Sequence, residues 1–202
     1  MTKEVNKPKD WEITEALGNL TCTSTRCEDN LHCFLRNMRK KVNRAKSYRN
    51  NTCVGCGKDV IDWNRIDMHN LEDKNYFVDC LKKETWRNAV WNLEIPQYMA
   101  KASSELNIDE MRLRVFNLLS NKINKKRSEI FRDGTQTPVG LKIIFLAQHA
   151  TGTCCRRCIE EWYGIDRNEI MNNEDINFLS EMILIYIKQK VSLRNQPKEQ
   201  KI

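Results

Sequence analysis

The stretch that decides the fold reads NEDINFLSEMILIYI over residues 173 to 187. Asn173 suits the N-cap of a helix, because its side chain can accept a hydrogen bond from a backbone amide of the first turn. Two acidic residues follow it, as the start of a helix favours. Apolar residues then recur at helical spacing, namely Ile176, Leu179, Met182, Ile183, Tyr186 and Ile187. This pattern predicts a helix that packs one face against a core.

The chain on either side of this stretch also favours helices. Seven glycines and four prolines are few for 202 residues, which argues against a many-turned β fold. Apolar stripes of helical period predict helices over 31–45, 73–93, 97–106 and 109–130. The apolar run 141–147 has no clear period, so a strand and a buried helix both fit it. We therefore predict a mainly α fold: a small zinc-stabilised helical protein with short loops and at most a minor β hairpin.

These elements predict four regions along the chain, and the polar loop 132–138 marks the boundary between the two helical ones. The regions are a partly ordered arm over 1–26, a zinc-bearing basic helical region over 27–131, a C-terminal helical region with a His/Cys cluster over 132–191, and a flexible tail over 192–202. No segment has the apolar length of a signal peptide or of a membrane span. We therefore expect a cytoplasmic protein that does not contact a membrane.

Basic residues are concentrated in one part of the sequence. Lysine and arginine number 34 against 27 acidic residues, a net charge of +7, and no acidic residue falls between positions 30 and 58. The cations that we expect on one helix face there are Arg36, Arg39, Lys40, Lys41, Arg44, Lys46 and Arg49. A fixed array of this kind predicts binding to nucleic acid phosphates with strong salt dependence. Simple solvation of a basic face is the alternative interpretation.

The first cysteine cluster is built around Cys53-Val-Gly-Cys56-Gly. Nine cysteines in a chain without signs of export favour metal binding or chemistry over a disulfide framework. A Cys-x-x-Cys turn supplies half of a tetrahedral zinc site. Cys22, Cys27, His32 and Cys33 are the candidates for the other half. We favour Zn²⁺ held by Cys27, Cys33, Cys53 and Cys56, with Cys22 and Cys27 as the upstream pair if the basic helix is long. A core thiol at position 33 beside a reduced or redox Cys53/Cys56 pair is the other interpretation.

The second cluster consists of His149, Cys154, Cys155 and Cys158. Gly152 can break the chain so that Thr153 caps a new helix that begins at 154, which places Cys155 and Cys158 on one face. The helix start and the adjacent Arg156 and Arg157 favour the thiolate form of these cysteines. The cluster therefore predicts a second metal site, or a thiol active site that uses His149 as base. A core helix with incidental thiols fits as well.

Two runs resemble a bacterial family known only as a domain of unknown function. They are DGTQTP at 133–138 and AQHATGTCCRRCIEEWYGI at 147–165, and the resemblance covers about residues 131–190. The family motif has the form DGxQTP followed by AQHATxTCCRxC and a tryptophan. This chain has Tyr163 where the family often has histidine, so a metal ligand at that position would be missing here. The resemblance implies no activity.

Three classes of function fit these features. The first is a zinc-binding protein that contacts nucleic acid phosphates through the basic helical face. The second is a metal- or thiol-dependent hydrolase or nuclease, for which the candidate catalytic residues are Asp133, Gln136, His149 and Cys155. The third is a small zinc-bearing subunit that docks on a protein partner. The sequence leaves open whether the protein is an enzyme.

Overall fold

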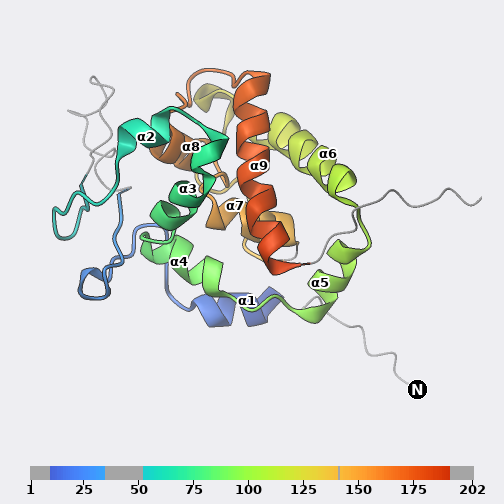
Figure 1. Ribbon diagram of the computed structural model, residues 1–202, viewed down its shortest axis with the longest axis horizontal. Coiled ribbons are helices and arrows are strands. Elements are labelled where there is room, and N and C mark those ends of the chain that lie inside the picture. The colour runs from blue at the N-terminus through green and yellow to red at the C-terminus, as the bar shows by residue number, and fades with distance from the viewer. Residues whose placement is uncertain (1–9, 35–51, 141, 192–202) are drawn as a thin grey trace, which may run out of the picture.

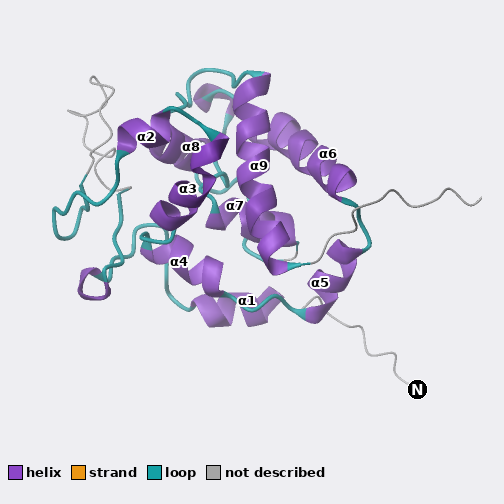
Figure 2. Cartoon of the chain, in the orientation of Figure 1, coloured by secondary structure: helices purple, strands orange, loops and turns teal. Residues whose placement is uncertain are grey.

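The computed structural model describes residues 10–34, 52–140 and 142–191, and this part of the chain is mainly helical. Figure 2 shows helices joined by loops throughout these residues. The helices are α1 (Asp10–Leu17), α2 (Trp63–Asp67), α3 (Lys74–Leu81), α4 (Thr85–Asn92), α5 (Gln97–Ser104), α6 (Ile108–Leu118), α7 (Ile143–Ala150), α8 (Arg156–Tyr163) and α9 (Asn173–Lys190). The predicted fold class is therefore confirmed.

Helix α9 lies in the middle of the molecule and organises its core (Figure 1). Asn172 and Asp175 form a capping box at its start, one residue before the predicted cap. The apolar stripe predicted from residues 173 to 187 is buried along its whole length. Both α6 and α7 pack against α9, and α4 packs against α7. The most periodic stretch of the sequence is thus the central helix of the fold.

Two predicted helices differ from the observed ones in the first half of the chain. The helix expected from Leu31 does not begin there, because residues 31–34 are extended: Leu31 pairs with Arg26, and His32 pairs with Glu84. The remainder of that helix, 35–45, lies outside the described residues. The helix expected over 73–93 is two helices, α3 and α4, which are separated by residues 82–84. The break places the buried side chain of Glu84 just before α4.

Two further elements settle questions that periodicity left open. The helix expected over 109–130 ends earlier, because α6 passes into a π-helical turn at Leu119–Ile123. Asn124 beyond this turn exchanges two hydrogen bonds with the backbone of Met171, which fixes where the chain leaves the helix. Residues 143–147 of the apolar run lie in α7, so this part of the run is helical rather than a strand.

A single apolar core includes residues from both sides of position 131. It reaches from Ile13 in α1 to Val191 after α9, and the contact between α4 and α7 crosses the predicted boundary. The division into regions at 131 stays a prediction. In the part of the chain that the structure describes, the helices are too short or too polar to cross a membrane.

Candidate metal centres

Four side chains from three places in the sequence meet at the first candidate metal centre. They are Cys27, His32, Cys53 and Cys56, and their sulfur and imidazole nitrogen atoms all lie within 4.8 Å of one another. The Sγ atoms of Cys27 and Cys53 are 3.7 Å apart, and Cys56 Sγ lies 3.6 Å from His32 Nδ1. All nine cysteines are free thiols. This first group could hold a metal ion.

A tight turn presents the two downstream thiols. Its ends are joined by an isolated antiparallel bridge between Thr52 and Asp59. Within the turn, Gly57 has φ of +74°, and its amide donates to the carbonyl of Cys53. The amide of Gly55 points at Cys53 Sγ at 3.4 Å, and a Cβ atom at position 55 would lie 3.1 Å from Cys27 Sγ. Glycine at 55 therefore lets the turn approach the upstream thiol closely.

The two upstream ligands are positioned by an extended segment. The backbone of His32 forms two hydrogen bonds with the chain at the start of α4. Its amide donates to the carbonyl of Lys83 at 2.7 Å, and its carbonyl accepts from the amide of Thr85 at 2.9 Å. Cys27 begins a short 3₁₀ turn, after which Asn30 takes a left-handed conformation that turns the chain toward His32. Because successive residues of an extended chain point to opposite sides, His32 and Cys33 do not face the same way.

Cys33 and Cys22 are not members of this first group. Cys33 is fully buried, and its thiol donates to the carbonyl of Cys22 at 3.4 Å. Cys22 Sγ accepts from the guanidinium of Arg157 at 3.3 Å, on the side of the second cluster. Of the four ligands favoured by the sequence, the structure therefore brings together Cys27, Cys53 and Cys56, and it places His32 where Cys33 was expected.

The thiols of Cys27 and Cys53 have pKa values shifted in opposite directions. Desolvation and the hydrogen bonds from Cys53 and Cys56 raise the pKa of Cys27 to about 12. Burial also acts to raise the pKa of Cys53, but the amides of Cys33, Cys56 and Gly55 outweigh it and lower that pKa to about 6. The sulfur of Cys53 is thus prepared to carry negative charge, as a metal ligand must.

The second candidate centre is formed by Cys154, Cys155 and Cys158, which are all buried. Their sulfur atoms also lie within 4.8 Å of one another. Cys155, rather than the expected Thr153, is the N-cap of α8, and its Sγ accepts from the amide of Cys158 at 3.4 Å. Hydrogen bonds from Cys154 and Cys155 hold the pKa of Cys158 well below its ordinary value, and Arg87 and Arg157 add to this effect.

His149 is near this second group but is not a member of it. Its ring Nε2 lies 3.2 Å from the carbonyl of Thr137, to which it donates, and its ring packs edge-on against Trp86. Burial lowers the pKa of His149. The imidazole is therefore occupied by a backbone contact, and the set of four ligands expected at this site stays a prediction.

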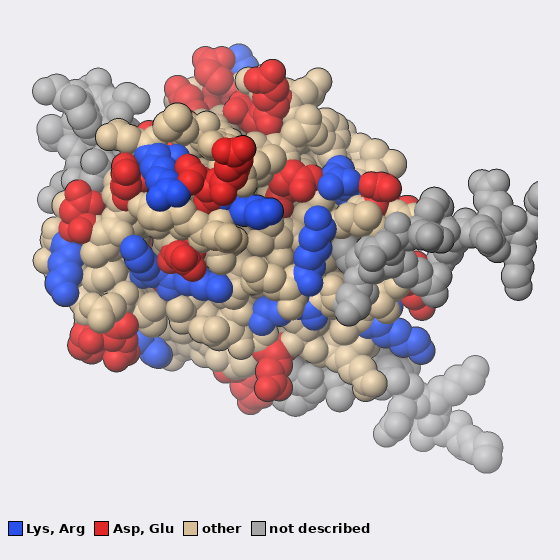
Figure 3. Space-filling model, viewed as in Figure 1, with Lys and Arg blue, Asp and Glu red and all other residues tan. Residues whose placement is uncertain are grey.

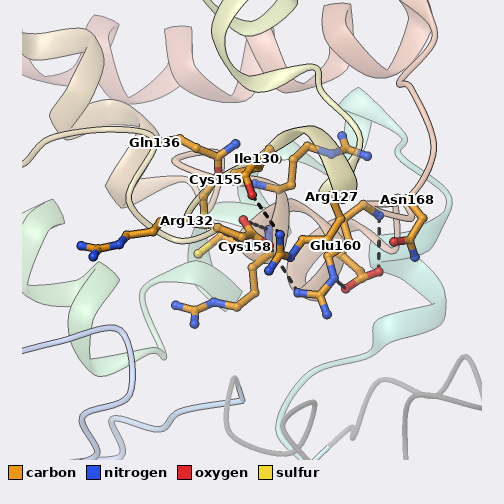
Figure 4. A network of polar contacts seen from close by, with 12 residues as sticks. Arg127, Ile130, Arg132, Gln136, Cys155, Cys158, Glu160 and Asn168 are labelled. Carbon is orange, nitrogen blue, oxygen red and sulfur yellow. Dashed lines mark hydrogen bonds and ion pairs between the residues drawn. The ribbon is translucent and has the colours of Figure 1, made fainter.

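The polar loop 132–138 wraps around the start of α8, where Figure 4 shows Gln136 close to Cys155. Asp133 accepts from the amide of Arg157 and pairs with Arg167, and Gln136 accepts from the amide of Arg156. Three of the candidate catalytic residues, Asp133, Gln136 and Cys155, are thus gathered around one helix end, whereas His149 lies in α7. Asp133 and Gln136 satisfy backbone amides that the first turn of a helix leaves free.

Buried charged side chains that sequence reasoning did not single out surround the second group. Glu84 and Arg87 are fully buried and form an ion pair at 2.5 Å, and Trp162 Nε1 donates to Glu84 at 3.0 Å. Burial raises the pKa of Glu84 to about 7. Glu161 is 6% exposed, and within the described residues neither of its carboxylate oxygens has a hydrogen-bond partner. Glutamates in helical stretches usually face solvent, so no local pattern marks these two glutamates as buried.

The charge of the described surface is mixed. The face drawn in Figure 3 carries lysines, arginines and acidic residues interspersed with one another. A pocket of about 720 Å³ between α6, the loop 132–138 and α7 is richer in cations, with Lys122, Lys125, Arg132 and Lys142 in its lining against Glu129. The seven predicted phosphate-binding cations, Arg36 to Arg49, lie outside the described residues.

Comparison with protein families places this chain beside one of them. A family model described as "Domain of unknown function (DUF4186)" matches residues 75–188, which is more than half of the chain. The second cysteine group lies within the matched stretch, and the first group precedes it. No solved structure matches the chain.

Proposed function

The chain belongs to the family described as a domain of unknown function (DUF4186), and we propose that it is a zinc-binding protein that contacts nucleic acid phosphates. The first group supplies the zinc ligands: Cys27, His32, Cys53 and Cys56. Zinc holds together the two ends of the basic segment 35–51, which lies between His32 and Cys53. The convergence of the four ligand atoms is the observation that carries this proposal.

The spacing of the ligand atoms supports tetrahedral zinc. With Zn–S bonds of about 2.3 Å and a Zn–N bond of about 2.0 Å, two sulfurs lie about 3.8 Å apart and a sulfur and a nitrogen about 3.5 Å apart. The corresponding separations here are 3.7 Å between Cys27 and Cys53 and 3.6 Å between Cys56 and His32. Three thiolates and one imidazole complete the coordination shell, which is the composition of a structural site.

The zinc ligands enclose the basic segment. Cys27 and His32 precede residues 35–51, and Cys53 and Cys56 follow them. The amide of Val54 also donates to the carbonyl of Cys33 at 2.9 Å, so the two ends of the segment meet at its base. Holding the ends of a loop together removes much of its conformational entropy, and this lowers the cost of ordering its cations on a phosphate backbone.

The charge of the segment sets the class of partner. It contains seven lysines and arginines and no acidic residue. Such a segment contacts phosphates, which gives affinity that falls steeply with salt and carries little sequence preference. Single- and double-stranded nucleic acids both present this backbone.

The metal is tested by counting ions on the purified full-length protein with elemental analysis. We expect zinc to co-purify and Cys56→Ser to lose one equivalent, because serine is a poor zinc ligand. Cys80→Ala is the matched control, since this buried thiol lies on α3 outside both cysteine groups. An unchanged zinc content in Cys56→Ser would contradict the proposed site.

The partner is tested by gel-shift titration of the same protein with a 20-nucleotide single strand and a 20-base-pair duplex at two salt concentrations. We expect binding at low salt that weakens at least tenfold at the higher concentration. Cys56→Ser should bind less tightly, because the ends of its basic segment are released. Absence of binding at low salt would remove nucleic acid from the proposal and leave the zinc site untouched.

A further inference from the structure

We propose that Cys154, Cys155 and Cys158 hold a second metal ion whose fourth position is taken by an exchangeable water molecule that hydrogen-bonds to Glu161. This site is separate from the one that defines the proposed function. It has three protein ligands rather than four, and three is the number found in metal sites that keep a position open for a small ligand.

The backbone holds the three sulfurs in place before any ion binds. Gly152 takes φ of +74° and turns the chain between α7 and α8. The hydroxyl of Thr137 then donates to the carbonyl of Cys154 at 2.8 Å, and the side-chain amide of Gln148 donates to the carbonyl of Thr153 at 3.2 Å. Cys155 and Cys158 share the first turn of α8. A preorganised set of thiols costs little to bring around an ion.

The negative charge of buried thiolates must be compensated, and a bound cation can do this. Three adjacent thiolates cannot all be ionised in a buried site without a positive charge among them. A divalent ion with three thiolates carries a net charge of −1. The guanidinium of Arg157 can offset one negative charge of the site, because among the described residues Arg157 forms no ion pair with a carboxylate. The nearby Arg87 is already neutralised by Glu84.

The buried carboxylate of Glu161 gives independent support for a bound water molecule at this site. It lies three residues after Cys158 on α8, so the two side chains share one face of the helix. Its carboxylate is buried and, within the described residues, accepts no hydrogen bond. A buried carboxylate without a donor is unfavourable by several kcal/mol. Water bound to a metal ion is a strong hydrogen-bond donor, and at this site it would satisfy Glu161.

The number of ions is tested first. Native mass spectrometry of the unmodified full-length protein should show two metal ions per chain. Cys158→Ser should lose one ion and Cys56→Ser the other, so that failure of either site is seen separately. Only one ion in the unmodified protein, or a metal count that Cys158→Ser leaves unchanged, would overturn the proposal. A disulfide within the second group, seen as a mass 2 Da lower in the unmodified protein, would also overturn it.

The open position is tested on the cobalt-substituted full-length protein by titration with azide. We expect the visible d–d bands of one of the two cobalt ions to shift, and we expect the shift to be lost in Cys158→Ser but kept in Cys56→Ser. Spectra that azide leaves unchanged would overturn the exchangeable position.

The role of Glu161 is tested by Glu161→Gln, with Glu160→Gln as the matched neighbour. Glu161→Gln should keep both ions and bind azide about tenfold more tightly, because a nearby negative charge is removed. Glu160 pairs with Arg167, which follows α8, so its variant should bind azide as the parent does. Loss of one ion in Glu161→Gln would show that the carboxylate is itself a ligand, which would overturn the water-filled position.

Discussion

The side chain of Trp162 and the carboxylate of Glu84 are joined by a buried hydrogen bond of 3.0 Å between Nε1 and Oε2. Trp162 lies on α8, one turn after the second cysteine group. Glu84 pairs through its backbone with His32 of the first group and through its side chain with Arg87. The two candidate metal centres are therefore connected through one buried glutamate.

This hydrogen bond leads to a prediction about stability. Trp162→Phe removes the donor and leaves the buried Glu84 carboxylate with a lone charged partner, Arg87. We expect the free energy of unfolding to fall by about 2–4 kcal/mol, from the lost bond to a charged group and the smaller ring. Urea unfolding of the metal-loaded protein measures it.

Trp91→Phe is the control for this substitution. The indole of Trp91 donates to the side chain of Gln189 at 3.2 Å, and Gln189 is a neutral, exposed partner. Its loss should cost about 1 kcal/mol. Equal losses of stability in the two variants would mean that burial of the ring, and not the bond to Glu84, accounts for the effect.

A second prediction concerns the turn before α8. A Cβ atom at Gly152 would lie 3.1 Å from both Cγ and Cδ1 of Trp162, and φ at this residue is +74°. Gly152→Ala should therefore destabilise the protein by about 2 kcal/mol or more, from the left-handed backbone and the close contact together. Gly18→Ala shares the positive φ, but its added Cβ would meet no atom closer than the Glu15 carbonyl oxygen at 4.0 Å, so it should lose only about 1 kcal/mol. Thermal unfolding of the two variants compares them, and equal shifts would contradict a role for Trp162.

Periodicity predicted the central helix α9 well. The stripe of α9 and the break at Gly152 were both visible in the sequence, because each depends on neighbouring residues. The division between α3 and α4 was not visible. It depends on the buried side chain of Glu84, whose partners Arg87 and Trp162 are brought to it by the tertiary fold.

The choice of the fourth ligand in the first group shows the same limit. Both His32 and Cys33 were candidates, and the expected helix gave no means of separating them. The observed segment is extended, so one of the two points to Cys27 and the other into the core. Its pairing with Glu84, 52 residues away, is long-range and left no local signal.

This difference gives a third prediction. His32→Ala should lose one equivalent of zinc, since it removes a proposed ligand, while Cys33→Ala should keep the full complement. Elemental analysis of both full-length variants decides between the two ligand sets. Cys33 is buried, so its variant is also checked by circular dichroism. Loss of zinc from folded Cys33→Ala with retention in His32→Ala would restore the ligand set expected from the sequence.

The last prediction separates the basic segment from the basic pocket. One variant changes Lys40, Lys41 and Arg44 to glutamine and so removes three charges from the segment. A second variant changes Lys122, Lys125 and Lys142 to glutamine and so removes three charges from the pocket lining. Each lost phosphate contact lowers the slope of log affinity against log salt by about 0.9 for duplex DNA. We expect the segment variant to lower the slope by about 2–3 and the pocket variant to change it by less than about 1. The two variants have the same net charge, so a difference between their slopes reports which surface contacts the phosphates. Gel-shift titrations across four salt concentrations measure both slopes. The opposite ranking would assign the phosphate contacts to the pocket, and equal changes would mean that net charge alone governs binding.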